Sequence, residues 1–252
     1  MPTRIALIIG FEIPVRFSAV YQTIFSDRVP GGPFRGMRHP AREVGSGKGI
    51  GARVLGTYEC ELWPQVEELC RLSHDGMITV GAAEGYYTVG LALRKPGVPI
   101  WAFEADDAIR AALEVNLKLN GVEHQVRVAG RCEPAQLVAA LDRLQHPLVI
   151  MDIEGGEREL LDPEKVPALR QADILVEVHD FVDGSIGNIL KARFAASHRL
   201  TEIWTRPRTD ADVPPGPLRW LLPLMKRRLV RSLDEGRGCE MRWFFLEPIP
   251  GV

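Results

Sequence analysis

Short apolar segments alternate with amphipathic segments along the chain from about residue 62 to its end. The apolar segments predict strands over residues 77–80, 99–103, 125–128, 148–153, 173–178, 200–204 and 241–246. Between them, apolar residues recur at helical spacing and predict helices over residues 65–72, 86–93, 108–119, 133–144 and 186–196. Strands that are apolar on both faces and alternate with helices are typical of a parallel sheet covered on both sides. The pattern therefore predicts an α/β fold with one doubly wound, Rossmann-like sheet.

Residues 1 to about 55 lack this order. The stretch from residue 29 to residue 51 is dense in Gly, Pro and Arg, which is typical of a loop or a mobile cover. Within it, Gly45-Ser-Gly-Lys-Gly49 is similar to a phosphate-binding loop, but the Gly four residues earlier and the Ser or Thr after the lysine are missing. We therefore expect an N-terminal extension or lid over residues 1–55 and the regular domain over residues 56–252.

The composition excludes several classes of protein. A formal net charge of -2 gives no overall attraction to nucleic acid or to an anionic membrane, so neither is expected as a partner. The four cysteines form no C-x-x-C pair, which argues against a zinc knuckle or a redox motif. No apolar run is long enough for a signal-peptide core or a membrane span, and a cytoplasmic location is expected. A basic stretch over residues 219–231 predicts a helix with a solvated cationic face or, alternatively, a patch for an acidic substrate or partner.

A glycine turn follows the strand at 77–80, and an acid follows the next strand. Gly81 and Gly85 lie in the turn, and Glu104 comes twenty-three residues after Gly81. Such a turn lets backbone amides approach a ligand, and an acid at the end of the next strand can hold two ribose hydroxyls. The pair predicts a nucleoside cofactor. An NAD fingerprint starting at Gly81 would also need glycine at the positions of Ala83 and Tyr86, so the NAD interpretation is disfavoured.

Acidic residues and a histidine follow two later strands. Asp152, with Glu154 and Glu157 close behind, ends one strand, and Glu177 shares one face of the next strand with His179. Asp152, Glu177 and His179 could hold a hard divalent cation or act as an acid–base group. Structural hydrogen bonding of the histidine and a helix-start role for Glu157 are the alternatives.

These motifs together resemble the FkbM-like family of S-adenosylmethionine-dependent methyltransferases. The resemblance covers roughly residues 56–179 and rests on Gly56-Thr-Tyr-Glu59, Val80-Gly-Ala-Ala-Glu-Gly-Tyr-Tyr-Thr88, Phe103-Glu104, Met151-Asp-Ile-Glu-Gly-Gly-Glu157 and Ile174-Leu-Val-Glu-Val-His179. It implies a seven-stranded Rossmann-like sheet with an antiparallel last strand, and methyl transfer from S-adenosylmethionine, often to a hydroxyl oxygen. By the same resemblance, the cofactor would be lined by Gly81, Ala82, Glu84, Gly85, Tyr86, Glu104 and Asp152.

The sequence departs from the family pattern at three places. Thr79 stands where an acid is common, Ala83-Glu84 replaces a small pair, and Val128-Ala-Gly-Arg-Cys132 carries no adenine-contacting acid. These changes concern the details of cofactor contact.

For methyl transfer to a hydroxyl, Asp152 or His179 would remove the proton, directly or through a bound magnesium ion. Tyr58 and Glu59 are candidates to close over the acceptor, which we expect to be a small molecule or glycan-like compound. The main alternative is a non-catalytic Rossmann-like nucleotide-binding or interaction protein. A homo-oligomer is compatible with the sequence.

Overall fold

The computed structural model describes residues 27–39 and 49–251, and the phosphate-loop-like segment at 45–48 lies outside these ranges. The described chain divides into two compact units. One unit holds the residues up to Trp63 together with Arg206–Cys239, and the other holds Pro64–Thr205 together with the residues from Glu240 onward. The 206–239 segment, which the expected boundary at residue 56 places with the regular domain, thus clusters with the N-terminal residues.

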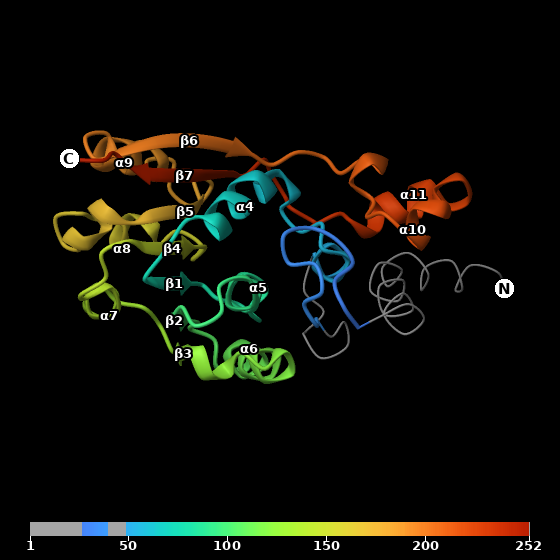
Figure 1. Ribbon diagram of the computed structural model, residues 1–252. Helices are drawn as coiled ribbons and strands as arrows, with labels where there is room; N and C mark the ends of the chain where they lie inside the picture. Colours follow the sequence, from blue (N-terminus) through green and yellow to red (C-terminus); the bar gives the residue numbers. More distant parts are fainter. Residues whose placement is uncertain (1–26, 40–48, 252) are drawn as a thin grey trace. The chain divides into compact units, whose positions relative to one another are not determined.

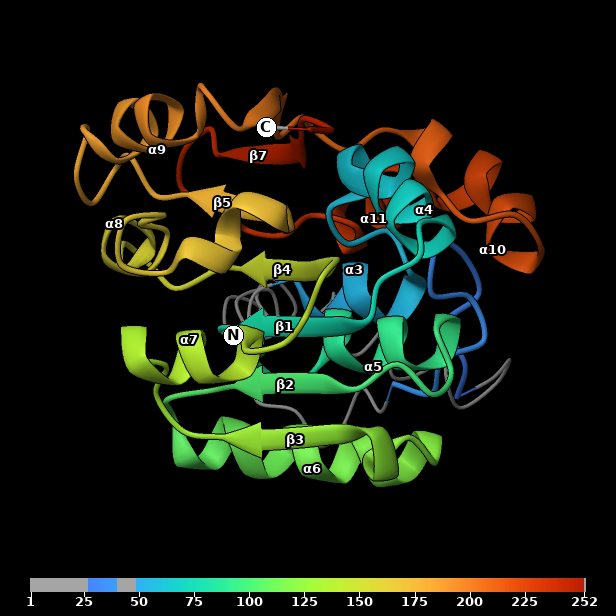
Figure 2. The ribbon, with the colours of Figure 1, turned by 60° about the vertical axis from the view of Figure 1, so that its left-hand side comes forward.

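The larger unit is built on a mixed sheet in the order β3-β2-β1-β4-β5-β7-β6. Its strands are β1 (Gly76–Val80), β2 (Ile100–Phe103), β3 (Val126–Ala129), β4 (Pro147–Met151), β5 (Asp173–Val178), β6 (His198–Trp204) and β7 (Arg242–Pro248). The pairs among β1 to β5 are parallel, whereas β7 runs antiparallel to both β5 and β6. Figure 2 shows β7 pointing in the direction opposite to β1 to β5. The expected seven-stranded Rossmann-like sheet with an antiparallel last strand is confirmed, and each predicted strand end lies within two residues of the observed one.

Helices cover both faces of this sheet. On one face lie α5 (Tyr86–Arg94) and α6 (Asp107–Asn120), and on the other lie α7 (Pro134–Leu141), α8 (Glu157–Leu160) and α9 (Ile186–Phe194) (Figure 1). The apolar residues of β1, β4 and β5 pack against α7, α8 and α9 in a continuous buried cluster. Burial on both faces explains why these strands read as unbroken apolar runs. Helix α4 (Trp63–Arg71) precedes β1 in the chain.

Helix α6 shows how local sequence places the strand ends. Asp106 caps its start by accepting the N–H groups of Ala108 and Ile109 at 2.8 and 3.0 Å. Gly121 ends it in the left-handed conformation, with φ 68°. A side-chain cap and a glycine stop satisfy backbone groups that the helix itself leaves unpaired. The helix therefore starts three residues after Glu104, and the N–H of its cap residue Asp106 bonds the Glu104 carboxylate at 2.9 Å.

The smaller unit has its own apolar cluster, formed by Leu55, Val213, Leu218, Leu229 and Leu233. Its elements are α3 (Ile50–Leu55), the 3₁₀ turns η1 (Cys60–Leu62) and η4 (Asp210–Asp212), α10 (Pro217–Trp220) and α11 (Leu222–Ser232). Helix α3 lies in a stretch expected to be irregular. Its six residues are too few to show a helical period, and glycines with positive φ, Gly49 and Gly56, bound it at both ends.

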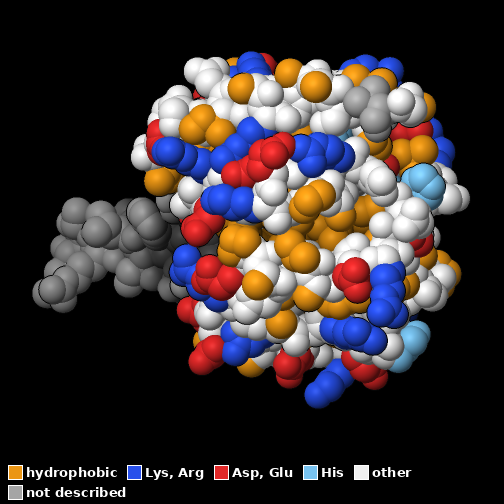
Figure 3. Space-filling model, turned by 90° about the vertical axis from the view of Figure 1, so that its left-hand side faces the viewer, with side chains coloured by type: hydrophobic (Ala, Val, Ile, Leu, Met, Phe, Trp, Pro, Cys, Tyr) orange, Lys and Arg blue, Asp and Glu red, His pale blue; other side chains and the backbone are white. Residues whose placement is uncertain are grey.

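No helix in the described ranges is both long and apolar enough to cross a bilayer. On the face shown in Figure 3, cationic and anionic side chains are intermixed around hydrophobic ones. A face with both signs of charge interspersed agrees with the near-neutral sequence.

Candidate functional site

The glycine turn after β1 is tightly packed between the two neighbouring strands. The N–H groups of Gly81 and Ala82 donate to the carbonyl oxygen of Phe103, at 3.0 and 2.9 Å. Gly81 has φ 75°, and a Cβ atom there would overlap the carbonyl oxygen of Asp152. Only glycine accepts that conformation and that approach together. The turn thus runs directly against the residues that end β2 and β4.

Glu104 lies beside this turn and is hydrogen-bonded to it. Its carboxylate accepts the N–H of Ala83 through one oxygen and the N–H of Asp106 through the other, both at 2.9 Å. Each carboxylate oxygen has more than one acceptor position, so both remain able to accept a hydroxyl from a ligand. The predicted ribose acid is therefore fixed beside the turn by backbone hydrogen bonds.

The other predicted cofactor residues line the same turn and the start of α5. Gly85 (φ 98°) precedes α5, and Ala82, Glu84 and Tyr86 are buried. The side-chain amide of Asn116 donates to the backbone oxygen of Glu84 at 2.8 Å, which ties the turn to α6. Where the family pattern has an acid, the hydroxyl of Thr79 instead bonds the hydroxyl of Thr88 at 2.9 Å, joining β1 to α5.

The ends of β4 and β5 bring four carboxylates around one histidine. His179 is 1% exposed, and its Nε2 lies 3.4 Å from Asp152, 3.6 Å from Glu154 and 3.7 Å from Glu177. The side chain of Asp152 is 34% exposed and that of Glu154 is 77% exposed, so these two carboxylates stand between the histidine and solvent. The structure thus brings together Asp152, Glu177 and His179, the residues predicted for chemistry.

Glu157 supports His179 from behind, a role that the sequence did not reveal. Its Oε1 lies 2.6 Å from Nδ1 of His179 and also accepts the N–H groups of Ile153 and Gly155, both at 3.3 Å. The side chain of Glu157 is fully buried, although the residue stands in the first turn of α8 as its helix-start interpretation requires. A carboxylate on Nδ1 orients the ring and directs Nε2 toward Asp152.

The carboxylates change the charge state of the histidine. Burial by itself lowers the pKa of His179, but the hydrogen bond to Glu157 and the charges of Glu157, Asp152 and Glu177 outweigh it and raise the pKa to about 9. At neutral pH the ring is therefore a cation that compensates its acidic neighbours.

This pKa predicts a pH-dependent contribution to stability. Because the folded pKa lies above the ordinary value of 6.5, the contribution is fully present below about pH 6.5 and is lost as pH rises through about 9. The loss should reach roughly 3 kcal/mol in the free energy of unfolding. Urea unfolding followed by tryptophan fluorescence, at pH 6, 7.5 and 9, measures it. The His179→Gln variant should lack this component, and an identical pH slope in both proteins would refute the assignment.

The segment after His179 combines a structural ion pair with exposed apolar side chains. Asp180 pairs with Arg242 of β7 through Nε at 3.0 Å and accepts the N–H of Gly187 at 2.9 Å. Phe181 is 58% exposed and Val182 55% exposed, and the ring of Phe181 meets the ring of His179 edge-on at 5.5 Å. The rim of the site beside His179 is therefore apolar.

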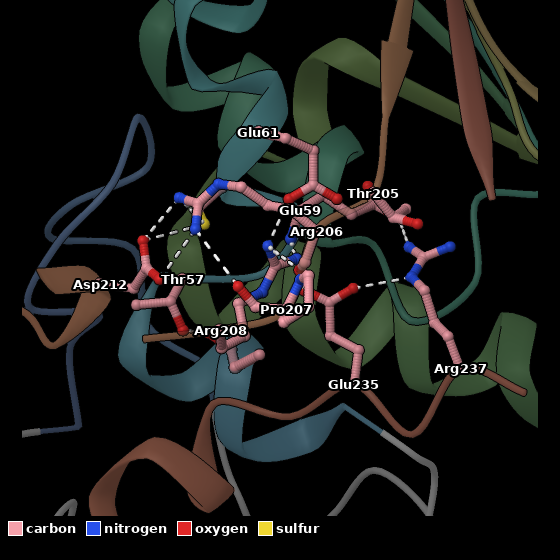
Figure 4. A network of polar contacts seen from close by, with 12 residues as sticks. Thr57, Glu59, Glu61, Thr205, Arg206, Pro207, Arg208, Asp212, Glu235 and Arg237 are labelled. Carbon is pink, nitrogen blue, oxygen red and sulfur yellow. Dashed lines mark hydrogen bonds and ion pairs between the residues drawn. The ribbon is translucent and has the colours of Figure 1, made fainter. Parts of the chain in front are cut away.

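Tyr58 and Glu59, predicted to close over an acceptor, belong to the smaller unit. Glu59 has φ 47° and is fully buried; its N–H donates to Glu235 at 2.9 Å, and its carboxylate pairs with Arg237 (Figure 4). Arg208 pairs with both Glu61 and Glu235 in the same network. The guanidinium of Arg53 stacks on the ring of Tyr58 at 4.7 Å. In this structure both residues hold the smaller unit together.

The candidate ligand atoms for a cation differ in one member from the predicted set. Among the described residues, one ligand atom each from Asp152, Glu154 and His179 lie within 4.8 Å of one another. The predicted set has Glu177 in place of Glu154. Oxygen and imidazole donors at this spacing suit a divalent cation, although the protonated histidine described above is the competing state.

Comparison with known proteins adds a likeness of architecture. No known protein family and no curated protein matches the sequence. Among solved structures, the O-methyltransferase TomG from Streptomyces achromogenes, in complex with S-adenosylmethionine, is 12% identical over 93% of this chain and 89% of its own, with a TM-score of 0.48. A precorrin-6y C5,15-methyltransferase from Geobacter metallireducens is 15% identical over 73% of this chain and 87% of its own, with a TM-score of 0.49. A putative O-methyltransferase from Klebsiella pneumoniae is 16% identical over 82% and 83%, with a TM-score of 0.45. Likeness at this level assigns no function.

Proposed function

We propose that this protein is an S-adenosylmethionine-dependent methyltransferase that methylates a hydroxyl oxygen. One observation carries the proposal: the Glu104 carboxylate is fixed at the glycine turn, and the Asp152–His179 group stands at the next two strand ends of the same sheet edge. Ligands of open α/β sheets bind at this edge, where the strand order reverses between β1 and β4. The five motifs that resemble the FkbM-like family support placing it in that family.

The residues present fit S-adenosylmethionine. Glu104 is held where it can accept both ribose hydroxyls, and the turn from Gly81 to Gly85 leads into the start of α5, where helix N–H groups lack partners within the helix. When bound, S-adenosylmethionine supplies a sulfonium-activated methyl group, so the protein must only align the acceptor, exclude water and take up a proton.

Asp152 is the residue best placed to take that proton. Its carboxylate reaches solvent, whereas His179 behind it is almost fully buried. With the methyl group supplied by the bound cofactor, a carboxylate oxygen of Asp152 would accept the proton of the acceptor hydroxyl. The cationic His179, held by Glu157, positions the carboxylate for this step.

The rim of the site suggests what the acceptor carries besides its hydroxyl. Phe181 and Val182 offer exposed apolar surface beside His179. A small molecule with a flat or apolar body, or the apolar face of a sugar ring, would cover these side chains and remove them from water.

Several further predictions accompany this function. Binding of magnesium by Asp152 and His179, with Glu177 or Glu154, would activate the hydroxyl as a Lewis acid does. Three other predictions also stand. Residues 1–55, Tyr58 and Glu59 are predicted to close over the acceptor. The location is predicted to be cytoplasmic, and the protein is predicted to form a homo-oligomer. The four cysteines form no disulfide among the described residues, in agreement with the expected reducing compartment.

The Glu104→Gln variant tests the cofactor assignment. We expect its affinity for S-adenosylhomocysteine to fall about 10- to 100-fold, because the charged acceptor for the ribose hydroxyls is lost. Asp107→Asn is the matched control, since that carboxylate lies three residues away and its side chain is 90% exposed. Isothermal titration calorimetry measures both affinities, and circular dichroism checks folding. Equal affinities in the two variants would remove Glu104 from the cofactor site.

A further inference from the structure

Helices α10 and α11 of the smaller unit have one face buried and one face turned outward. Leu218, Leu229 and Leu233 are buried in the cluster of this unit, and Leu221, Leu222 and Met225 pack against it. Apart from Lys226, which pairs with Asp210, the exposed positions between them are Arg219, Trp220, Pro223, Leu224, Arg227, Arg228 and Arg231. We call these seven residues the outer face.

The outer face is cationic without counterions. In the described part of the chain, the side chains of Arg219, Arg227, Arg228 and Arg231 form no ion pair or hydrogen bond, whereas the neighbouring Lys226 pairs with Asp210 at 2.6 Å. Four unpaired guanidinium groups within thirteen residues attract a surface that carries many negative charges.

The same face carries two large apolar side chains in water. Trp220 is 78% exposed and Leu224 is 84% exposed, the highest values among the large hydrophobic residues described. They lie four residues apart, ahead of the arginine-rich half of α11. Such exposure is unfavourable in the isolated protein and indicates a surface that is covered during function.

We propose that the outer face binds the surface of an anionic phospholipid membrane. Trp and Leu enter the interface between headgroups and acyl chains, and arginines beside them bind the phosphates. Nucleic acid satisfies the arginines and can stack on Trp220, but it offers Leu224 no apolar environment. The combination therefore favours the membrane. The near-neutral total charge of the chain led to the expectation of no membrane partner. That total is a sum over the whole chain, so it does not reveal a local concentration of arginine.

Co-sedimentation of the full chain with vesicles tests the proposal. Vesicles of phosphatidylcholine with phosphatidylserine should bind the protein, and vesicles of phosphatidylcholine alone should bind it at least about tenfold more weakly. Two double variants, Trp220→Ala with Leu224→Ala and Arg227→Glu with Arg228→Glu, should each lower the binding to the anionic vesicles by about tenfold or more.

Arg131→Glu with Arg199→Glu is the control for a general change of charge. These arginines are 76% and 73% exposed and lie in the other unit, so vesicle binding should stay within about twofold of the parent protein. Affinity for S-adenosylhomocysteine, measured in all variants, should not change, which separates this proposal from the proposed function. Absence of binding to anionic vesicles would overturn the proposal. So would equal losses in the control, or binding of single-stranded RNA that depends on Arg227 and Arg228 in place of vesicle binding.

Discussion

Replacing Asp152 by asparagine is expected to lower the turnover number of methyl transfer about 10²- to 10⁴-fold. The variant keeps the shape of the side chain and its neighbours but loses the group that receives the hydroxyl proton. Because Asn still offers an oxygen acceptor, affinity for S-adenosylhomocysteine should stay within about threefold. Transfer of a tritiated methyl group to the best acceptor from a screen of hydroxyl compounds measures the turnover number, and calorimetry measures the affinity.

Glu154→Gln is the matched control for this prediction. Its carboxylate lies 3.6 Å from the same nitrogen of His179, against 3.4 Å for Asp152, yet it is 77% exposed. If Asp152 is the proton acceptor, the Glu154→Gln control should keep a turnover number within about threefold of the parent protein. The charge of an exposed carboxylate is screened by water and contributes little to the reaction. Similar large losses in both variants would contradict the assignment and would favour a cation shared by the two carboxylates.

Gly81→Ala is expected to destabilise the larger unit by at least about 3 kcal/mol and to abolish cofactor binding. The positive φ of 75° disfavours any side chain, and the new Cβ would overlap the carbonyl oxygen of Asp152. To relieve the overlap, the turn must move away from β4. This movement would also displace Ala83, whose N–H bonds the Glu104 carboxylate. Urea unfolding followed by fluorescence gives the change in stability.

Gly97→Ala separates backbone strain from the overlap. Gly97 has φ 84°, and a Cβ atom there would meet nothing within 4 Å. We expect a cost of about 1 kcal/mol, from the conformation alone. If Gly81→Ala were no more costly than Gly97→Ala, the turn would not be packed against Asp152 as described.

Features with a local cause could be predicted from the sequence. The apolar runs of β1, β4 and β5 follow from burial on both faces, and Asp106 and Gly121 bound α6 through short-range hydrogen bonds. Because parallel strands end at the same edge, the residues after them could be assigned to one site before their contacts were known. Glu104 and Asp152 were found in this way.

Features that depend on side-chain orientation or on distant pairing could not be predicted. Glu157 and His179 are 22 residues apart, and no spacing rule indicates that the carboxylate turns back from α8 to meet the ring. The pairing of Asp180 with Arg242 joins residues 62 positions apart. Likewise, segment 206–239 clusters with the N-terminal residues through Arg208 and Arg237, whose acidic partners no local pattern identifies.

Calorimetric titration of the full chain with S-adenosylhomocysteine, with NAD titrated in parallel, tests the methyltransferase assignment. The proposed methyltransferase predicts micromolar binding of S-adenosylhomocysteine and none of NAD, because the turn lacks two glycines of the dinucleotide fingerprint and Glu104 offers its carboxylate to one ribose. Added magnesium should strengthen the binding of S-adenosylhomocysteine only if the carboxylates around His179 hold a cation. Binding of NAD, or of neither compound, would contradict the account.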